Sequence, residues 1–87
     1  MDQSLLQFIK AIGEPTRLRI LRHLKNECCV GEIWKKLDLS QNLASHHLRV
    51  LKDADLISAE KRGLKVVYRL NERELARGLK RLGSYLE

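Results

Sequence analysis

The chain has 87 residues, 44% of them hydrophobic, and a formal net charge of +6. This length predicts one domain, residues 1–87, that buries only about 60–65% of its unfolded surface, so a partner subunit would help to stabilise it. Excess positive charge favours polyanions such as nucleic acid or an anionic membrane surface. No apolar run approaches the roughly 18 residues of a membrane span, and the N-terminus lacks the layout of a signal peptide. We therefore expect a cytoplasmic protein with no membrane partner.

The same sequence argues against an enzyme. It contains no glycine-rich phosphate loop, no carboxylate pair with an evident cleft and no metal motif of catalytic spacing. Cys28 and Cys29 are adjacent, with Cα atoms about 3.8 Å apart, whereas disulfides prefer roughly 4.4–6.8 Å. This spacing excludes a disulfide scaffold, and it is not the Cys-x-x-Cys redox motif. No cofactor is expected to be required.

Apolar residues at helical spacing predict two helices before residue 26. The first, over about residues 4–13, places on one face Leu5, Ile9 and Ile12, with Phe8 beside them. It ends at Gly13-Glu14-Pro15, because the residue before a proline is pushed out of the α region. Pro15 suits the first turn of the second helix, which runs to about Lys25. The residues expected to face inward in this helix are Leu18, Leu21 and Leu24, and those expected to supply positive charge are Arg17, Arg19, Arg22 and Lys25.

The middle of the chain predicts a helix-turn-helix over about residues 30–54. A short helix from about Val30 to Leu37 has its apolar residues on one side. Asp38-Leu39-Ser40 forms the turn, and Ser40 is a suitable N-cap for a helix that continues to about Ala54. On a wheel of about 100° per residue, the inner side of this second helix carries Leu43, Ala44, His47, Leu51 and Ala54, flanked by Leu48 and Val50.

The outer side of that helix carries groups that read DNA. Amides read adenine edges, arginine reads guanine or phosphate, and hydroxyl and imidazole groups reach either. Residues near the start of such a helix usually contact bases, whereas Arg49 and Lys52 lie further along and are expected to contact phosphate. The alternative for each residue is a solvated surface side chain. The DNA-binding candidates here are Ser40, Gln41, Asn42, Ser45, His46, Arg49 and Lys52.

His47 is interpreted differently from its neighbour His46. Its position on the wheel lies among apolar residues, which indicates a histidine of the core or of an interface. The pair is a poor metal site by itself, because adjacent residues on a helix diverge by about 100°.

Two alternating segments predict a basic β-hairpin, or wing, over about residues 57–70. The strands are Ile57–Arg62 and Lys65–Leu70, with Gly63 in the turn. A basic hairpin beside a recognition helix can follow the DNA backbone or enter the minor groove; the alternative is a solvated turn. The DNA-binding candidates at the tip are Lys61, Arg62 and Lys65, with Arg69 nearby, and the residues expected to point inward are Val66, Tyr68 and Leu70.

A last helix is predicted over about residues 72–86, with Asn71 as its cap. Its leucines form a narrow stripe that fits packing between subunits; the alternative is a helix that lies on its own domain's core. Together with the helix over residues 4–13, it gives a predicted homodimer interface of Leu5, Ile9, Leu75, Leu79, Leu82 and Leu86.

Four segments resemble the ArsR-type (ArsR/SmtB) family of bacterial and archaeal winged-helix repressors: AIGEPTRLRILRHL (11–24), CCVGEI (28–33), LSQNLASHHLRVLKDADLI (39–57) and VVYRL (66–70). The resemblance implies a mainly α fold with a small β-hairpin, a winged helix-turn-helix of order α-α-α-α-β-β-α. It also implies a homodimer, joined through the first and last helices, that binds an imperfect inverted repeat in double-stranded DNA and represses the adjacent operon.

Members of this family commonly release DNA when a metal or a thiol-reactive effector binds. Against the family's arsenic-type site, Cys29 matches the first thiol, but Gly31 and Trp34 replace the other two. The zinc-type site needs histidine on the last helix, which has none. Both sites are therefore expected to be absent.

Cys28 and Cys29 remain the effector candidates. Cys29 is expected at the N-cap of the short helix, where the helix dipole favours a thiolate that could meet an oxidant, reactive sulfur or a soft metal. His23 could complete a Cys-plus-His site. The alternative is two small, partly buried side chains at the start of a helix.

Together these features predict a sequence-specific, homodimeric transcriptional repressor. The alternatives are a nonspecific architectural nucleic-acid binder and a winged-helix module that binds protein. The amide- and hydroxyl-rich face argues against the first of these, because binding to the backbone alone needs mainly lysine and arginine.

Overall fold

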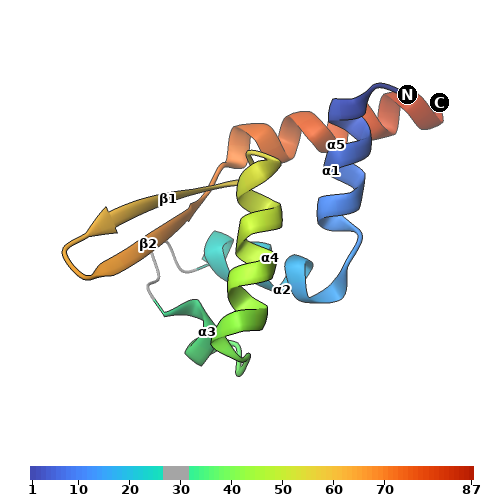
Figure 1. The fold of residues 1–87 in the computed structure, drawn as a ribbon. Helices are drawn as coiled ribbons and strands as arrows, with labels where there is room; N and C mark the ends of the chain where they lie inside the picture. The colour runs from blue at the N-terminus through green and yellow to red at the C-terminus, as the bar shows by residue number, and fades with distance from the viewer. Residues whose placement is uncertain (27–31) are drawn as a thin grey trace.

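The computed structural model describes residues 1–26 and 32–87. Figure 1 shows a helical body from which a hairpin projects, with both chain ends close together at the opposite side. This arrangement confirms the predicted mainly helical fold with a small β-hairpin. The elements in order are α1 (Gln3–Ile12), α2 (Pro15–Asn26), α3 (Ile33–Lys36), α4 (Gln41–Asp53), β1 (Ile57–Arg62), β2 (Lys65–Leu70) and α5 (Glu72–Leu86).

Side-chain caps fix the starts of three helices. The Ser40 hydroxyl accepts a hydrogen bond of 3.1 Å from the Leu43 N–H, and the Asn71 side chain accepts one of 3.4 Å from the Glu74 N–H. The Asp2 carboxylate does the same for α1, at 2.8 Å from the Leu5 nitrogen. Each bond satisfies a backbone donor that the first helical turn leaves without a partner. The predicted caps Ser40 and Asn71 are confirmed.

The short helix α3 is a single turn, and it ends earlier than the predicted Leu37. The Leu37 N–H still bonds to the carbonyl of Ile33, but Asp38 then takes a positive φ of 54°. A left-handed residue turns the chain out of the helix. The predicted start at Val30 and the predicted capping position of Cys29 lie outside the described residues.

The core lies where α1, α2, α4 and the base of the hairpin meet. Its most completely buried large side chains are Ile20, Ile33, Leu51 and Leu56. Burying such a side chain stabilises the fold by roughly 1.5–3 kcal/mol. The buried hydrophobic residues are Leu5, Phe8, Ala11, Ile20, Leu21, Leu24, Ile33, Ala44, Leu48, Leu51, Leu56 and Ile57.

Two predicted inward positions are wrong. Leu18 is 51% exposed, and Ile20 takes its place in the core beside Leu21. Because each residue turns the helix by about 100°, Leu18 lies about a quarter turn away from the buried face. Leu43 is exposed for the same reason, since it lies at the edge of the face that buries Ala44.

The last helix α5 packs against α1 through a close contact at Gly78. This glycine is buried, and a Cβ atom at its position would overlap the ring of Phe8. At the ends of the same two helices, Arg81 donates to both carboxylate oxygens of Asp2, at 2.7 and 2.6 Å. The absence of a side chain at Gly78 therefore lets the two helices approach each other.

The hairpin has the predicted strands, paired antiparallel with Arg62 opposite Lys65. Gly63 has a positive φ of 62°, as the first central residue of a tight two-residue turn requires. Because side chains alternate, the face that packs on the core carries Ile57 and Leu70, then Ala59 and Tyr68, and finally Lys61 and Val66. Tyr68 and Leu70 pack against the core. Val66 shares this inward face, as predicted, but it is 39% exposed, because it lies beyond the end of the core.

Candidate nucleic-acid interface

The helix α4 separates its residues into two sides. Ala44, His47, Leu48 and Leu51 are buried, so the helix has a fixed orientation on the body. All the candidates predicted for the outer side are exposed: Ser40, Gln41, Asn42, Ser45, His46, Arg49 and Lys52.

Hydrogen bonds hold the turn that precedes α4. The Leu39 N–H donates to the Trp34 carbonyl at 2.8 Å. From α2, the Arg19 guanidinium donates to the Leu37 carbonyl at 3.2 Å. These two bonds therefore fix the turn just before the start of α4, whose outer side is exposed.

His47 is buried, as its wheel position predicted, and it belongs to a polar cluster inside the body. Arg17 approaches His47 Nδ1 with Nη1 at 3.1 Å, and Glu14 Oε2 lies 3.6 Å from the same nitrogen. Burial, opposed by Glu14 and aided by Arg17 and His46, holds the pKa of His47 below its ordinary value. A neutral ring can accept a hydrogen bond from Arg17.

Arg17 was predicted to supply positive charge, and the structure adds contacts that the sequence did not indicate. Its guanidinium also donates to the carbonyls of Ala11, at 2.7 Å, and Lys10, at 2.9 Å. These carbonyls lie in the last turn of α1, where they have no partner within the helix.

The wing exposes the predicted basic candidates Lys61, Arg62 and Lys65. Glu60, which the sequence pattern did not single out, receives a hydrogen bond of 3.2 Å from Arg62. At the turn, Leu64 is fully exposed between these cations.

Two hollows separate the wing from the helix-turn-helix. One, of about 430 Å³, lies between α4 and the wing. The other, of about 340 Å³, lies between α3, the start of α4 and the wing. Ser45, Val66 and Tyr68 line both hollows.

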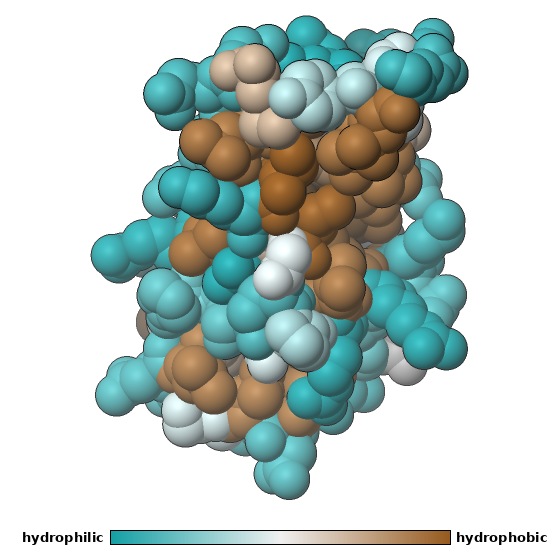
Figure 2. All heavy atoms as spheres, turned by 90° about the vertical axis from the view of Figure 1, so that its right-hand side faces the viewer, coloured by the Kyte–Doolittle hydropathy of each residue, from teal (hydrophilic) through white to brown (hydrophobic). Residues whose placement is uncertain are grey.

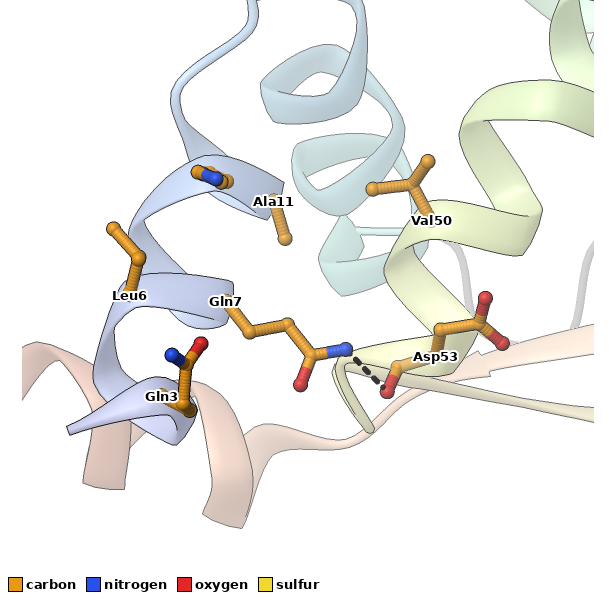
Figure 3. A pocket seen from close by; sticks show the side chains of 7 residues that line it. Gln3, Leu6, Gln7, Ala11, Val50 and Asp53 are labelled. Atoms are coloured by element: carbon orange, nitrogen blue, oxygen red, sulfur yellow. Dashed lines mark hydrogen bonds between the residues drawn. The ribbon is translucent and has the colours of Figure 1, made fainter.

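A third hollow, of about 410 Å³, lies between α1 and α4. Figure 3 shows Gln7 reaching across it towards α4, with Leu6 and Val50 on opposite walls. The Gln7 amide donates to the Asp53 backbone carbonyl at 3.0 Å. It thereby satisfies an acceptor at the end of α4.

The residues predicted for a dimer interface fall into two groups. Leu5 is buried within its own chain, and Ile9, Leu75 and Leu82 pack partly against the same core. Leu79 and Leu86 are 51% and 74% exposed. Figure 2 views the molecule from the side of α1 and the C-terminal end of α5, and it shows apolar side chains gathered in a patch there.

No three His, Cys, Asp or Glu side chains that could hold a metal ion come together in the described part of the chain. Cys28 and Cys29, the predicted effector residues, lie outside it. Among the helices of residues 1–26 and 32–87, none has the length and apolar character to cross a membrane.

A helix-turn-helix followed by a hairpin defines the winged helix class. Comparison with protein families extends this result: the model of the bacterial regulatory protein arsR family matches residues 14–59, more than half of the chain. The chain belongs to this family. The matched model describes a bacterial regulatory protein, which agrees with the prediction that the chain is not an enzyme.

Individual relatives agree with this assignment. The chain is 41% identical over 63 residues to the transcriptional repressor SdpR of Bacillus subtilis, covering 71% of this chain and 70% of that protein. It is 35% identical over 71 residues to the HTH-type transcriptional repressor SmtB of Mycobacterium tuberculosis, covering 80% of this chain. Because only 53% of SmtB is covered, the chain spans about half the length of that relative.

A solved structure supports the fold. The ArsR-like transcriptional regulator from Rhodococcus sp. RHA1 superposes with a TM-score of 0.79 at 27% identity. The match covers 95% of this chain and 80% of the other. The winged helix fold is therefore shared over nearly the whole chain.

Proposed function

We propose that this protein is a sequence-specific, homodimeric transcriptional repressor that places α4 in the major groove of an operator. The observation that carries this proposal is the division of α4 into a buried side and an exposed side. The exposed residues include the Asn42 amide and the Ser45 hydroxyl, groups that hydrogen-bond to base edges. Because the buried side fixes the helix, these groups are presented in a set orientation.

Cations on two elements support a duplex as the partner. Arg49 and Lys52 on α4 and Lys61 and Lys65 on the wing are exposed. Each phosphate neutralised by such a cation releases counterions. The logarithm of the binding constant therefore falls with the logarithm of the salt concentration, with a slope of about 0.9 per phosphate contact. Because operator DNA lies in the cytoplasm, the proposed function places the protein there.

Selection of duplexes from a random pool, followed by affinity measurement over a range of salt concentrations, tests this function. We expect an inverted repeat whose half-sites lie about 34 Å apart, bound roughly 10³-fold or more tightly than random duplex. Equal affinity for selected and random duplexes would instead identify an architectural binder. No duplex affinity at low salt would identify a module that binds protein.

The proposed homodimer rests on the apolar residues that α5 leaves uncovered, Leu79 and Leu86. We expect Leu79→Glu to convert the protein to a monomer in sedimentation equilibrium. Leu18→Glu is a matched control, because Leu18 on α2 has the same exposed fraction of 51%. Its dimer should persist, and equal effects of the two substitutions would argue against an interface on α5.

We include in this proposal an effector that reacts with Cys28 or Cys29 and releases the DNA. The support is chemical, since vicinal thiols can be oxidised or can bind a soft metal. DNA affinity of the wild type, Cys28→Ser and Cys29→Ser should be compared in reductant, in oxidant and with a soft metal. Identical behaviour of all three proteins in every condition would remove the effector from the proposal.

A further inference from the structure

Alternate residues of the wing form an apolar strip on the face turned towards α4. We define the wing strip as Leu64, Val66 and Tyr68. Exposure decreases along it, from the fully exposed Leu64 at the tip, through Val66 at 39%, to the half-buried Tyr68. Of these three residues only Tyr68 packs against the core. Leu64 and Val66 are therefore open to a ligand.

The wing strip faces the base-reading side of α4. Val66 and Tyr68 line both hollows beside the wing, and both hollows are also lined by Ser45. The hollows therefore adjoin each other at Ser45. Whatever occupies them lies directly beside a group that is proposed to meet the DNA.

The charges around the hollows favour an anionic occupant. Arg49 and Lys52 line the hollow on the α4 side, and Lys65 lines the other on the wing side. Lys61 is paired with Val66 across the hairpin and projects from the same face. The acids that line the hollows are Asp53 and Glu32, and Glu32 is paired with Lys35 at 3.3 Å.

A DNA strand combines the two kinds of group that these walls would accept. Its deoxyriboses offer apolar surface, and its phosphates carry regularly spaced negative charge. An apolar protein segment could bury its surface against the wing strip, but it would offer no negative charge to the surrounding cations. The position beside Ser45 also makes the hollows continuous with the proposed base-reading surface.

We propose that one DNA strand runs between α4 and the wing, with its deoxyriboses against Val66 and its phosphates within reach of the Tyr68 hydroxyl and the flanking cations. This inference rests on the proposed function and adds two positioning residues to it. Because sugars and phosphates are the same at every base pair, the contact contributes equally to selected and random duplexes.

Val66→Ala is the direct test, and Val67→Ala is its matched control. Val67 is the same residue type on the same strand, but it faces the opposite side of the hairpin, opposite Glu60. Affinity is measured for a random duplex at low salt and for a duplex selected by the wild type. We expect Val66→Ala to weaken both by roughly three- to tenfold, because alanine buries less apolar surface against the deoxyriboses, while Val67→Ala changes neither.

Tyr68→Phe keeps the ring that packs on the core and removes only the hydroxyl. We expect an affinity loss of about two- to tenfold, the range for one hydrogen bond, with an unchanged urea midpoint. Hydroxyl-radical footprinting gives a second readout, because the radical attacks the sugars. The wild type should protect the sugars between the half-site and the flanking minor groove, and Val66→Ala should lose this protection selectively.

The outcomes separate this inference from the function on which it rests. If Val66→Ala binds both duplexes and protects the same sugars as the wild type, the strand contact is wrong, while a preference for the selected duplex still supports the repressor. If the wild type shows no such preference but Val66→Ala weakens random binding, the repressor is wrong and the strand contact stands. A wild type without duplex affinity overturns both.

Discussion

The side chains of Arg17 and His47, thirty residues apart in the chain, meet with Nη1 and Nδ1 separated by 3.1 Å. Because arginine only donates, Nδ1 must accept, and the ring hydrogen lies on Nε2. The same guanidinium binds the carbonyls of Lys10 and Ala11. One side chain of α2 therefore joins the end of α1 to the buried side of α4.

Arg17→Lys should destabilise the fold, because lysine cannot reproduce the planar arrangement that serves these three acceptors. Losing hydrogen bonds to partly buried groups predicts a decrease of about 1–3 kcal/mol in the free energy of unfolding. Urea unfolding measures it. Arg22→Lys, at an exposed position of the same helix, should change stability by less than about 0.5 kcal/mol. Equal midpoints for the two variants would contradict a bridging role for Arg17.

Stability should decrease as the pH falls below about 6.5, the ordinary pKa of histidine. Burial lowers the pKa of His47 in the folded protein, so between the lowered pKa and 6.5 the unfolded chain binds the extra proton. The contribution is fully present above pH 6.5 and is lost as the pH falls towards the folded pKa. Unfolding of the wild type and His47→Asn should be measured from pH 7.5 to 5.

We expect His47→Asn, which does not titrate, to show a shallower pH dependence over this range. The carboxylates do not mask the effect. A backbone hydrogen bond lowers the pKa of Asp2 from 3.8. Burial would raise the pKa of Glu14, but backbone hydrogen bonds and nearby positive charge lower it from 4.5. Both contributions are therefore lost only below pH 4.5, outside the measured range. Parallel curves for the two proteins would show that His47 is not responsible.

Gly78→Ala and Gly83→Ala should shift the melting temperature in opposite directions. A Cβ at Gly78 would overlap the Phe8 ring, whereas one at Gly83 would meet nothing within 4 Å. Overpacking costs about 1–3 kcal/mol, while alanine in an open helical position gains about 0.5–1 kcal/mol over glycine. In a domain of this size, each kcal/mol shifts the midpoint by roughly 4–8 °C. Both substitutions should be melted in the monomeric Leu79→Glu variant, because Gly83 lies one helical turn after Leu79 on the face proposed for the dimer. Stabilisation by both would exclude the close contact.

Asn42→Ala and Lys61→Ala should separate base recognition from phosphate binding. Asn42→Ala is expected to relax the preference at one base pair at a cost of about 1–3 kcal/mol, with the same salt dependence. Lys61→Ala should weaken all duplexes alike and reduce the salt slope by about 1. Affinities for a set of single-base operator variants, measured at several salt concentrations, distinguish the two effects. A uniform loss from Asn42→Ala would place that residue on the backbone instead.

Local chemistry explains why much of the fold was predictable. Ser40 and Asn71 are caps whose effect depends only on the next few residues, and Gly63 supplies the positive φ of a tight turn. The wheel placed His47 on the buried side because its neighbours at helical spacing are apolar. Helical spacing wrongly placed Leu18 on the buried side of α2 and Leu43 on the buried side of α4, because periodicity alone does not locate the edge of a buried face.

The exposure and the contacts of residues near the ends of elements could be established only from the tertiary structure. Val66 continues the alternation of Tyr68 and Leu70, yet it extends past the core and is exposed. Arg17 has the pattern of a surface cation, and its acceptors come from the end of α1 and from α4. Neither outcome follows from spacing, since both depend on where distant segments end.

The sequence by itself determined the order of the elements, the two strands of the hairpin and the exposed polar side of Gln41–Asp53, because helix and strand periodicity and capping act within a few residues. Only the tertiary structure decided that Arg17 joins α1 to α4 and that the wing strip lies open beside Ser45. Contacts between segments many residues apart depend on how the elements pack, and packing is a property of the whole chain.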